Sequence, residues 1–157
     1  MKKRLLTILL VLVLVLGMFA FAACDRDEPL DIVPFEDGIT IVIVSEQTIV
    51  SYEVDLKDQG FTTGNKVIDV LFYLRDSEGL HLDGSTSSYG YMVTEIGGLK
   101  PTAPNYVSIY TSVVADQDLA SEYSSEINYK GNKVVTANFG ISDLTFEKDA
   151  IILFVLA

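Results

Sequence analysis

The order in which hydrophobic periodicity changes along the chain most constrains its fold. Residues 39–44 (ITIVIV) form a short, unbroken apolar run that is rich in β-branched side chains. After a polar break at 45–48, apolar residues alternate with polar ones along 49–56. Both patterns are typical of β-strands, and their close spacing predicts a β-hairpin.

The period then changes from that of a strand to that of a helix. Four apolar residues recur at positions i, i+3, i+4 and i+7, which is the spacing of one helix face: Val67, Val70, Leu71 and Leu74. We expect Asn65 to cap this helix and Gly79 to end it. The apolar face should pack on the sheet that the hairpin begins.

The rest of the chain has strand-like runs and no second helix of comparable strength. Strands are expected at 91–96, 106–114, 134–137 and 151–156, and the last run is apolar enough for a central strand. Residues 80–89, with Asp83-Gly84 as a turn signal, are expected to form a loop. Residues 115–133 are expected to form a long loop or a poorly paired hairpin. Two strands followed by one helix predict an α+β fold: a β-grasp-like mixed sheet with one main helix packed across it.

The N-terminus has the order of an export signal. Lys2, Lys3 and Arg4 precede the apolar run 5–16, and two alanines stand directly before Cys24. Lipoprotein signal peptides place the lipidated cysteine at this point. We therefore expect residues 1–23 to be a lipoprotein signal peptide, with Cys24 lipidated and the protein held on the extracytoplasmic face of the cell membrane. The alternatives are a secretory signal cut near Ala23 and an uncleaved membrane anchor.

Residues 24–37 link this predicted anchor to the folded part. The segment is acidic, contains two prolines and has no clear period, which is the composition of a solvated tether. Ile32, Val33 and Phe35 leave open the alternative that the segment docks as an edge strand. The sequence thus divides into a signal peptide (1–23), a lipidated cysteine with an acidic tether (24–37) and one folded domain (38–157).

Charge and composition exclude several classes of function. Residues 1–23 hold three of the 11 basic residues and none of the 22 acidic ones, so the remainder has a net formal charge of −14. Such a surface repels phosphate, which argues against nucleic-acid binding. One cysteine excludes an intramolecular disulfide. A single histidine and the lack of a nucleophile elbow, a phosphate-binding glycine loop or a zinc-protease motif argue against an enzyme.

Three segments together resemble a known family. Residues 64–71 (GNKVIDVL) are similar to a Gly-Asp-Thr-Val-Leu-Asp-Ala-Leu helix start, and 90–99 (GYMVTEIGGL) to a Gly-x-x-Val-x-x-Ile-x-Gly-Leu signature. Residues 140–144 (GISDL) are similar to a Gly-Ile-x-Asp-Tyr motif. These motifs, in this order, resemble the transcobalamin-like carboxy-terminal domain family of bacterial surface proteins, over roughly residues 39–155. The chain departs from the family in having no tryptophan, and Tyr106 is the aromatic residue nearest to the family's tryptophan position.

The resemblance implies a β-grasp binding module. In related cobalamin carriers this domain covers one face of the corrin, so a cobalamin-type ligand is the implied ligand class, and no cofactor is required. The candidate ligand-binding residues are tyrosines and serines around the second motif: Ser87, Ser88, Tyr89, Tyr91, Tyr106 and Tyr110. Tyrosine offers a rigid apolar ring with a polar tip, which suits a flat ligand. The alternative is that these tyrosines only cover a sheet and that the serines form a solvated loop.

No metal site is expected from the sequence. His81 is the one imidazole, and a lone ligand is a weak metal signal. Asp116, Asp118 and Glu122 do not have the spacing of a calcium loop.

The predicted function is that of a lipid-anchored extracytoplasmic binding protein that captures a cobalamin-type or related cofactor for uptake. Its partners would be the membrane through the lipid, a small-molecule cofactor, and a membrane transporter or surface protein. The alternative is a structural or adhesion module that binds a cell-surface protein without a small-molecule ligand.

Overall fold

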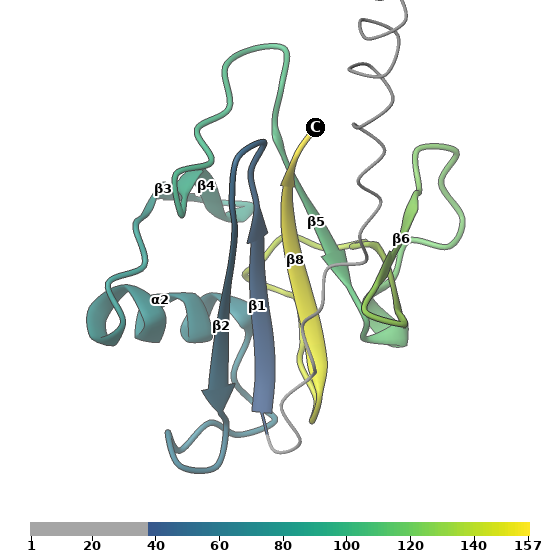
Figure 1. Cartoon of the computed structure of the whole chain (residues 1–157). Helices are drawn as coiled ribbons and strands as arrows, with labels where there is room; N and C mark the ends of the chain where they lie inside the picture. Colours follow the sequence, from purple (N-terminus) through teal and green to yellow (C-terminus); the bar gives the residue numbers. More distant parts are fainter. Residues whose placement is uncertain (1–37) are drawn as a thin grey trace, which may run out of the picture.

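A computed structural model describes residues 38–157, and the predictions on Cys24, the signal peptide and the tether lie outside these described residues. The chain forms an α+β fold, with a six-stranded mixed sheet, a separate two-stranded sheet and one α-helix within the described part (Figure 1). The strand order of the large sheet is β2-β1-β8-β5-β7-β6. None of the helices between residues 38 and 157 has the length and apolar content needed to cross a membrane.

The predicted first hairpin is confirmed. β1 (Gly38–Val44) and β2 (Ile49–Asp55) pair antiparallel in continuous register. The closing strand β8 (Ala150–Leu156) lies between β1 and β5 (Val107–Thr111), parallel to the former and antiparallel to the latter. The central position predicted for the last apolar run is therefore confirmed as well.

The helix α2 (Val67–Ser77) runs across the strands, and its predicted apolar face is buried (Figure 1). Val67, Val70, Leu71 and Leu74 are each at most 1% exposed and pack with the β1 side chains Ile39, Ile41 and Ile43. Gly79 ends the helix with a φ of 72°, and Leu80 N donates to Leu74 O. The predicted cap at Asn65 is wrong, because the helix begins one residue later, with Lys66 at the N-cap position.

Asp69 explains the shift of the cap. Its Oδ2 accepts a hydrogen bond from Lys66 N at 2.8 Å and another from Asn65 Nδ2 at 3.2 Å. Asn65 Oδ1 instead accepts from Thr62 N, three residues earlier. Asn65 therefore closes the preceding turn, and an acid in the first helical turn satisfies the free backbone amide.

The expected loop at 80–89 is wrong in part. Residues Leu82–Ser87 form β3, which pairs antiparallel with β4 (Gly90–Ile96), and the turn occupies only Ser88 and Tyr89. Asp83-Gly84 is thus not a turn but the site of a register shift inside β3. The strand has only one buried residue, Leu82, so the apolar alternation that marks a half-buried strand is missing.

The segment 115–133 contains an ordered hairpin. A 3₁₀ turn (η1, Val114–Asp116) is followed by β6 (Glu126–Tyr129), which pairs with β7 (Asn132–Thr136) through four residue pairs. The segment was expected to be a long loop or a poorly paired hairpin. The structure has a hairpin, and its strands pair in regular register. Tyr129 and Val134 from this hairpin pack with Val42, Ile151 and Leu153 on the sheet face away from α2.

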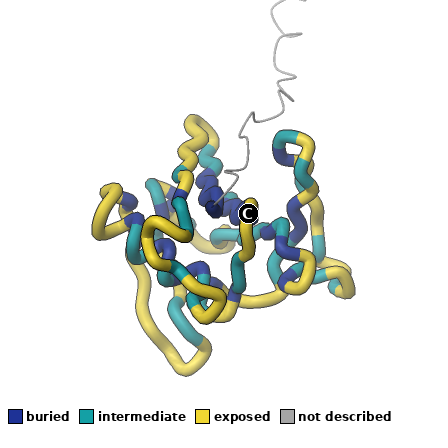
Figure 2. Tube along the Cα trace, turned by 90° about the horizontal axis from the view of Figure 1, so that it is seen from below, coloured by how far each residue is buried: buried dark blue, intermediate teal, exposed yellow. Residues whose placement is uncertain are grey.

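Both faces of the central strands are therefore covered. Side chains of one parity on β1 and β8 pack under α2, and those of the other parity pack under the β6–β7 hairpin. The continuous apolar runs of β1 and β8 follow from this double burial. Figure 2 shows the buried residues gathered in the middle of the trace, with exposed residues on the outer turns.

Candidate ligand-binding pocket

A pocket of about 440 Å³ lies where the β3–β4 hairpin meets the large sheet. Phe154 and Ile141, which are at most 1% exposed, contribute its buried wall. Tyr89, Met92 and Tyr106 contribute its exposed part, with 93%, 62% and 62% of their surface accessible. The complete lining comprises Ser87, Tyr89, Gly90, Tyr91, Met92, Val93, Pro101, Asn105, Tyr106, Val107, Ile109, Gly140, Ile141 and Phe154.

Tyr91 is held from three sides. Its ring meets the Phe72 ring edge to face at a centroid distance of 5.4 Å, and its backbone N donates to Ser142 Oγ at 2.8 Å. Gly84 lies against the ring on the neighbouring strand, since a Cβ there would stand 2.5 Å from Tyr91 Cε1. The helix, the loop before β8 and β3 therefore all position this side chain.

Tyr106 is fixed through its backbone. Its N donates to Ala157 O at 3.0 Å, and Ala157 N donates back to Tyr106 O at 2.9 Å. This pair extends the β5–β8 ladder beyond Val107, which pairs with Leu156. The main chain of Tyr106 is thus fixed, while its ring stays exposed at the pocket.

The structure brings four of the six predicted ligand-binding residues to this pocket: Ser87, Tyr89, Tyr91 and Tyr106. Ser87 Oγ accepts from Tyr89 N and donates to Gly90 O, so its hydroxyl is engaged in the hairpin turn. Ser88 lies in the same turn but does not line the pocket. Tyr110 lines a neighbouring hollow with Tyr106 and Tyr123, and its hydroxyl is hydrogen bonded to Ser125 Oγ at 2.9 Å.

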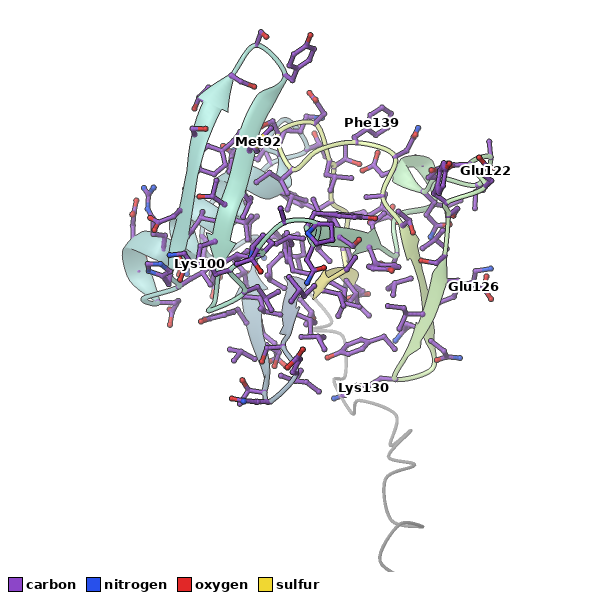
Figure 3. The ribbon with its side chains drawn as sticks, turned by 90° about the horizontal axis from the view of Figure 1, so that it is seen from above. Met92, Lys100, Glu122, Glu126, Lys130 and Phe139 are labelled. Carbon is purple, nitrogen blue, oxygen red and sulfur yellow. The ribbon has the colours of Figure 1, made fainter. Side chains whose placement is uncertain are left out.

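The pocket is mostly apolar and aromatic. Lining of this kind, with a few polar groups, is typical of small-molecule sites, and the volume lies within their usual range of about 300–1,000 Å³. Figure 3 shows Met92 on the β3–β4 hairpin and Phe139, on the loop before β8, toward the same side of the molecule. Met92, Ile141 and Phe154 carry no signal of ligand binding in the sequence, because apolar character alone predicts only burial.

Two of the acidic residues considered for calcium, Asp116 and Asp118, accept hydrogen bonds from neighbouring loops. Asp116 is 4% exposed, and its Oδ2 accepts from both Thr145 N and Thr145 Oγ1 at 2.6 Å. Asp118 Oδ1 accepts from the backbone of Ala120 and Ser121. These two carboxylates therefore hold loops of the second half of the chain together.

His81 has ligand-type neighbours that the sequence analysis missed. Asp83 and Glu95 stand beside it at the base of the β3–β4 hairpin. Predicting this contact requires the pairing register of β3 with β4, and β3 was expected to be a loop.

Comparison with known proteins gives information on the fold. No family model matches the chain, and no curated protein matches it. Thirteen chains of solved structures match it. One of them is the crystal structure of a putative metal binding protein from Ruminococcus gnavus ATCC 29149. It matches with a TM-score of 0.50 and 17% sequence identity, and the match covers 78% of this chain and 97% of that chain. At this identity the likeness concerns the fold alone.

Proposed function

We propose that this chain is a lipid-anchored, extracytoplasmic binding protein that captures a cofactor of the cobalamin type for uptake. The observation that carries the proposal is the pocket whose lining combines Tyr91 and Tyr106 with the buried side chains of Ile141 and Phe154. The N-terminal signal sequence and Cys24 support the location.

We further propose that the fold is of the β-grasp type. The β1–β2 hairpin followed by α2 across the sheet supports this assignment, as does the parallel pairing of β1 with β8. The likeness in motifs to the transcobalamin-like family supports it as well. The Ruminococcus gnavus protein, which is similar in fold, is described as a putative metal binding protein, so a metal is another ligand class to consider.

The size of the pocket limits a large cofactor to contact through one part of its surface. A volume of about 440 Å³ is that of a site for a small ligand, and Tyr89, Met92 and Tyr106 leave it open to solvent. A site of this shape buries only part of a corrin, so affinity for the isolated protein should be modest. A transporter or surface protein that covers the opposite face would complete the site.

The test is titration of the full chain, purified in detergent, with cobalamin and with cobinamide, followed by calorimetry and by the absorbance of the corrin. Tyr91→Ala and Tyr106→Ala should each weaken binding by about 1–2 kcal/mol, the scale of losing an aromatic contact residue. Tyr123→Ala is the matched control, because Tyr123 is an exposed tyrosine outside this pocket. The lack of heat and of spectral change at about millimolar ligand would refute the proposal.

The exposed aromatic surface favours one second candidate, a module that binds a cell-surface protein. Five large apolar side chains are more than 40% exposed around the pocket and the neighbouring hollow: Tyr89, Met92, Tyr106, Tyr123 and Phe139. Exposed apolar groups that cluster on one side are typical of protein interfaces. In that case the same titration would be silent, and Tyr123→Ala and Tyr106→Ala would both reduce attachment to the partner.

A further inference from the structure

Three side chains of the types that can ligate metals converge at the base of the β3–β4 hairpin. His81 Nε2 lies 3.4 Å from Asp83 Oδ2 and 3.2 Å from Glu95 Oε1. One ligand atom from each residue lies within 4.8 Å of the other two. Within residues 38–157 this is the one group of three such side chains that approach so closely.

These separations are those that a bound metal ion needs. Zinc ligands with nitrogen or oxygen donors stand about 2.1 Å from the ion, so two ligands of a tetrahedral site are about 3.4 Å apart. Both distances from the imidazole already have this value within 0.2 Å. The oxygens of the two carboxylates lie within 4.8 Å of each other, and rotation of the exposed Asp83 side chain can adjust this separation.

The backbone that carries the three residues is anchored to the core on one side of the register shift in β3. Asp83 and Glu95 are direct cross-strand partners, next to the pair formed by Leu82 and Ile96. Leu82 is 5% exposed and Ile96 is 0% exposed, so this pair fixes the base of the hairpin to the core. Gly97 N donates to His81 O at 2.8 Å, which extends the ladder to the histidine.

The charges at this position favour a cation. Two carboxylates that face each other across a strand pair repel, so the arrangement is stabilised by positive charge. Lys100 Nζ lies 2.9 Å from Glu95 Oε2. Lys100 occupies one oxygen of Glu95 and leaves Oε1 directed to the imidazole. Figure 3 places Lys100 at the base of the hairpin, away from Met92.

We propose that His81, Asp83 and Glu95 bind a divalent transition-metal ion, with Zn²⁺ as the preferred example. The imidazole favours Zn²⁺ over Mg²⁺ and Ca²⁺, which select oxygen ligands. Three protein ligands leave a fourth tetrahedral position for water or for an atom of a partner. The site is separate from the proposed cofactor pocket, because none of its three ligands lines that pocket.

The test is titration of the full chain in detergent, made without a histidine tag, with ZnCl₂. His81 is the one histidine of the chain, so its imidazole ¹⁵N resonances report on the site without ambiguity. We expect one equivalent of Zn²⁺ to shift the Nε2 resonance, with calorimetry giving the same midpoint. MgCl₂ at equal concentration should leave the resonance in place.

Two carboxylate variants make the test specific. Glu95→Gln should weaken Zn²⁺ binding more than about tenfold, since even loss of a group that only supports a ligand costs about 10- to 100-fold. Glu126→Gln is the matched control. Glu126 also lies on a hairpin and pairs with a lysine, Lys133, but it does not belong to the group around His81. An unmoved His81 resonance, or equal weakening in both variants, would overturn the proposal.

Discussion

Gly84 is the position where one added methyl group should disturb both the small hairpin and the pocket. A Cβ at Gly84 would lie 2.3 Å from Met92 O and 2.5 Å from Tyr91 Cε1. Unbonded heavy atoms prefer about 3.5–4.0 Å, so both contacts overlap by about an ångström or more. The carbonyl oxygen belongs to the backbone and cannot rotate away. β3 and β4 must therefore separate locally, and Tyr91 must leave its position against Phe72.

We expect Gly84→Ala to lower the free energy of unfolding by about 1–3 kcal/mol, the usual cost of overpacking. Because the chain has no tryptophan, urea unfolding is best followed by far-UV circular dichroism. Ser85→Ala is the matched control, an exposed residue on the same strand, and should change stability by less than about 0.5 kcal/mol.

A double variant separates the two clashes. In Gly84→Ala/Tyr91→Ala the ring is gone, so the combined loss should be smaller than the sum of the two single losses. Additive losses, or a Gly84→Ala loss no larger than that of Ser85→Ala, would refute the reasoning that the Tyr91 ring packs on Gly84.

Three further predictions concern the core, a buried phenol and the N-terminus. Leu71→Ala should cost about 2–5 kcal/mol in urea unfolding, and a loss below about 1 kcal/mol would contradict the burial of this helix face. Tyr129 is fully buried, and no described residue hydrogen bonds its hydroxyl, so Tyr129→Phe should be neutral or stabilising by about 1 kcal/mol. Burial raises the pKa of Tyr129 to about 12 from 10.0, so the unfolded chain ionises first and stability falls as pH rises through this interval. That part of the alkaline loss should be absent from Tyr129→Phe, and its persistence there would contradict the assignment. Cys24→Ser should give a precursor without lipid label, whereas a mature protein that begins at another residue would exclude lipidation at Cys24.

The large sheet could be predicted from the sequence because burial on both faces leaves a strong pattern. The runs at 39–44 and 151–156 are continuous and apolar since α2 covers one face and the β6–β7 hairpin covers the other. The helix was equally clear, because four buried residues repeat with its period.

The small hairpin left no such pattern. Only one of the six residues of β3 is buried. Gly84 resembles a turn residue in the sequence, but in the structure it lies within the strand, where the Tyr91 ring leaves no room for a side chain. The contact of His81 with Glu95 depends on a register that includes a shift between Asp83 and Gly84, which no local rule specifies.

Only part of the pocket lining could be predicted from the sequence. Tyrosines near the second motif were selected for their chemistry, and the structure gathers Tyr91 and Tyr106 at one pocket. Its buried wall comes from the loop at Ile141 and from β8, far along the chain, and only the tertiary fold brings these residues together.

Mapping a bound corrin onto the backbone is the decisive test of cofactor binding at the Tyr91 pocket. The measurement is the set of amide ¹H–¹⁵N shifts of the full chain in detergent, with and without cobinamide. We expect the perturbed amides to gather at the pocket lining, including Tyr91, Val107 and Ile141, while those of the β6–β7 hairpin stay in place. Unchanged spectra, or shifts confined to that hairpin, would contradict binding at this pocket.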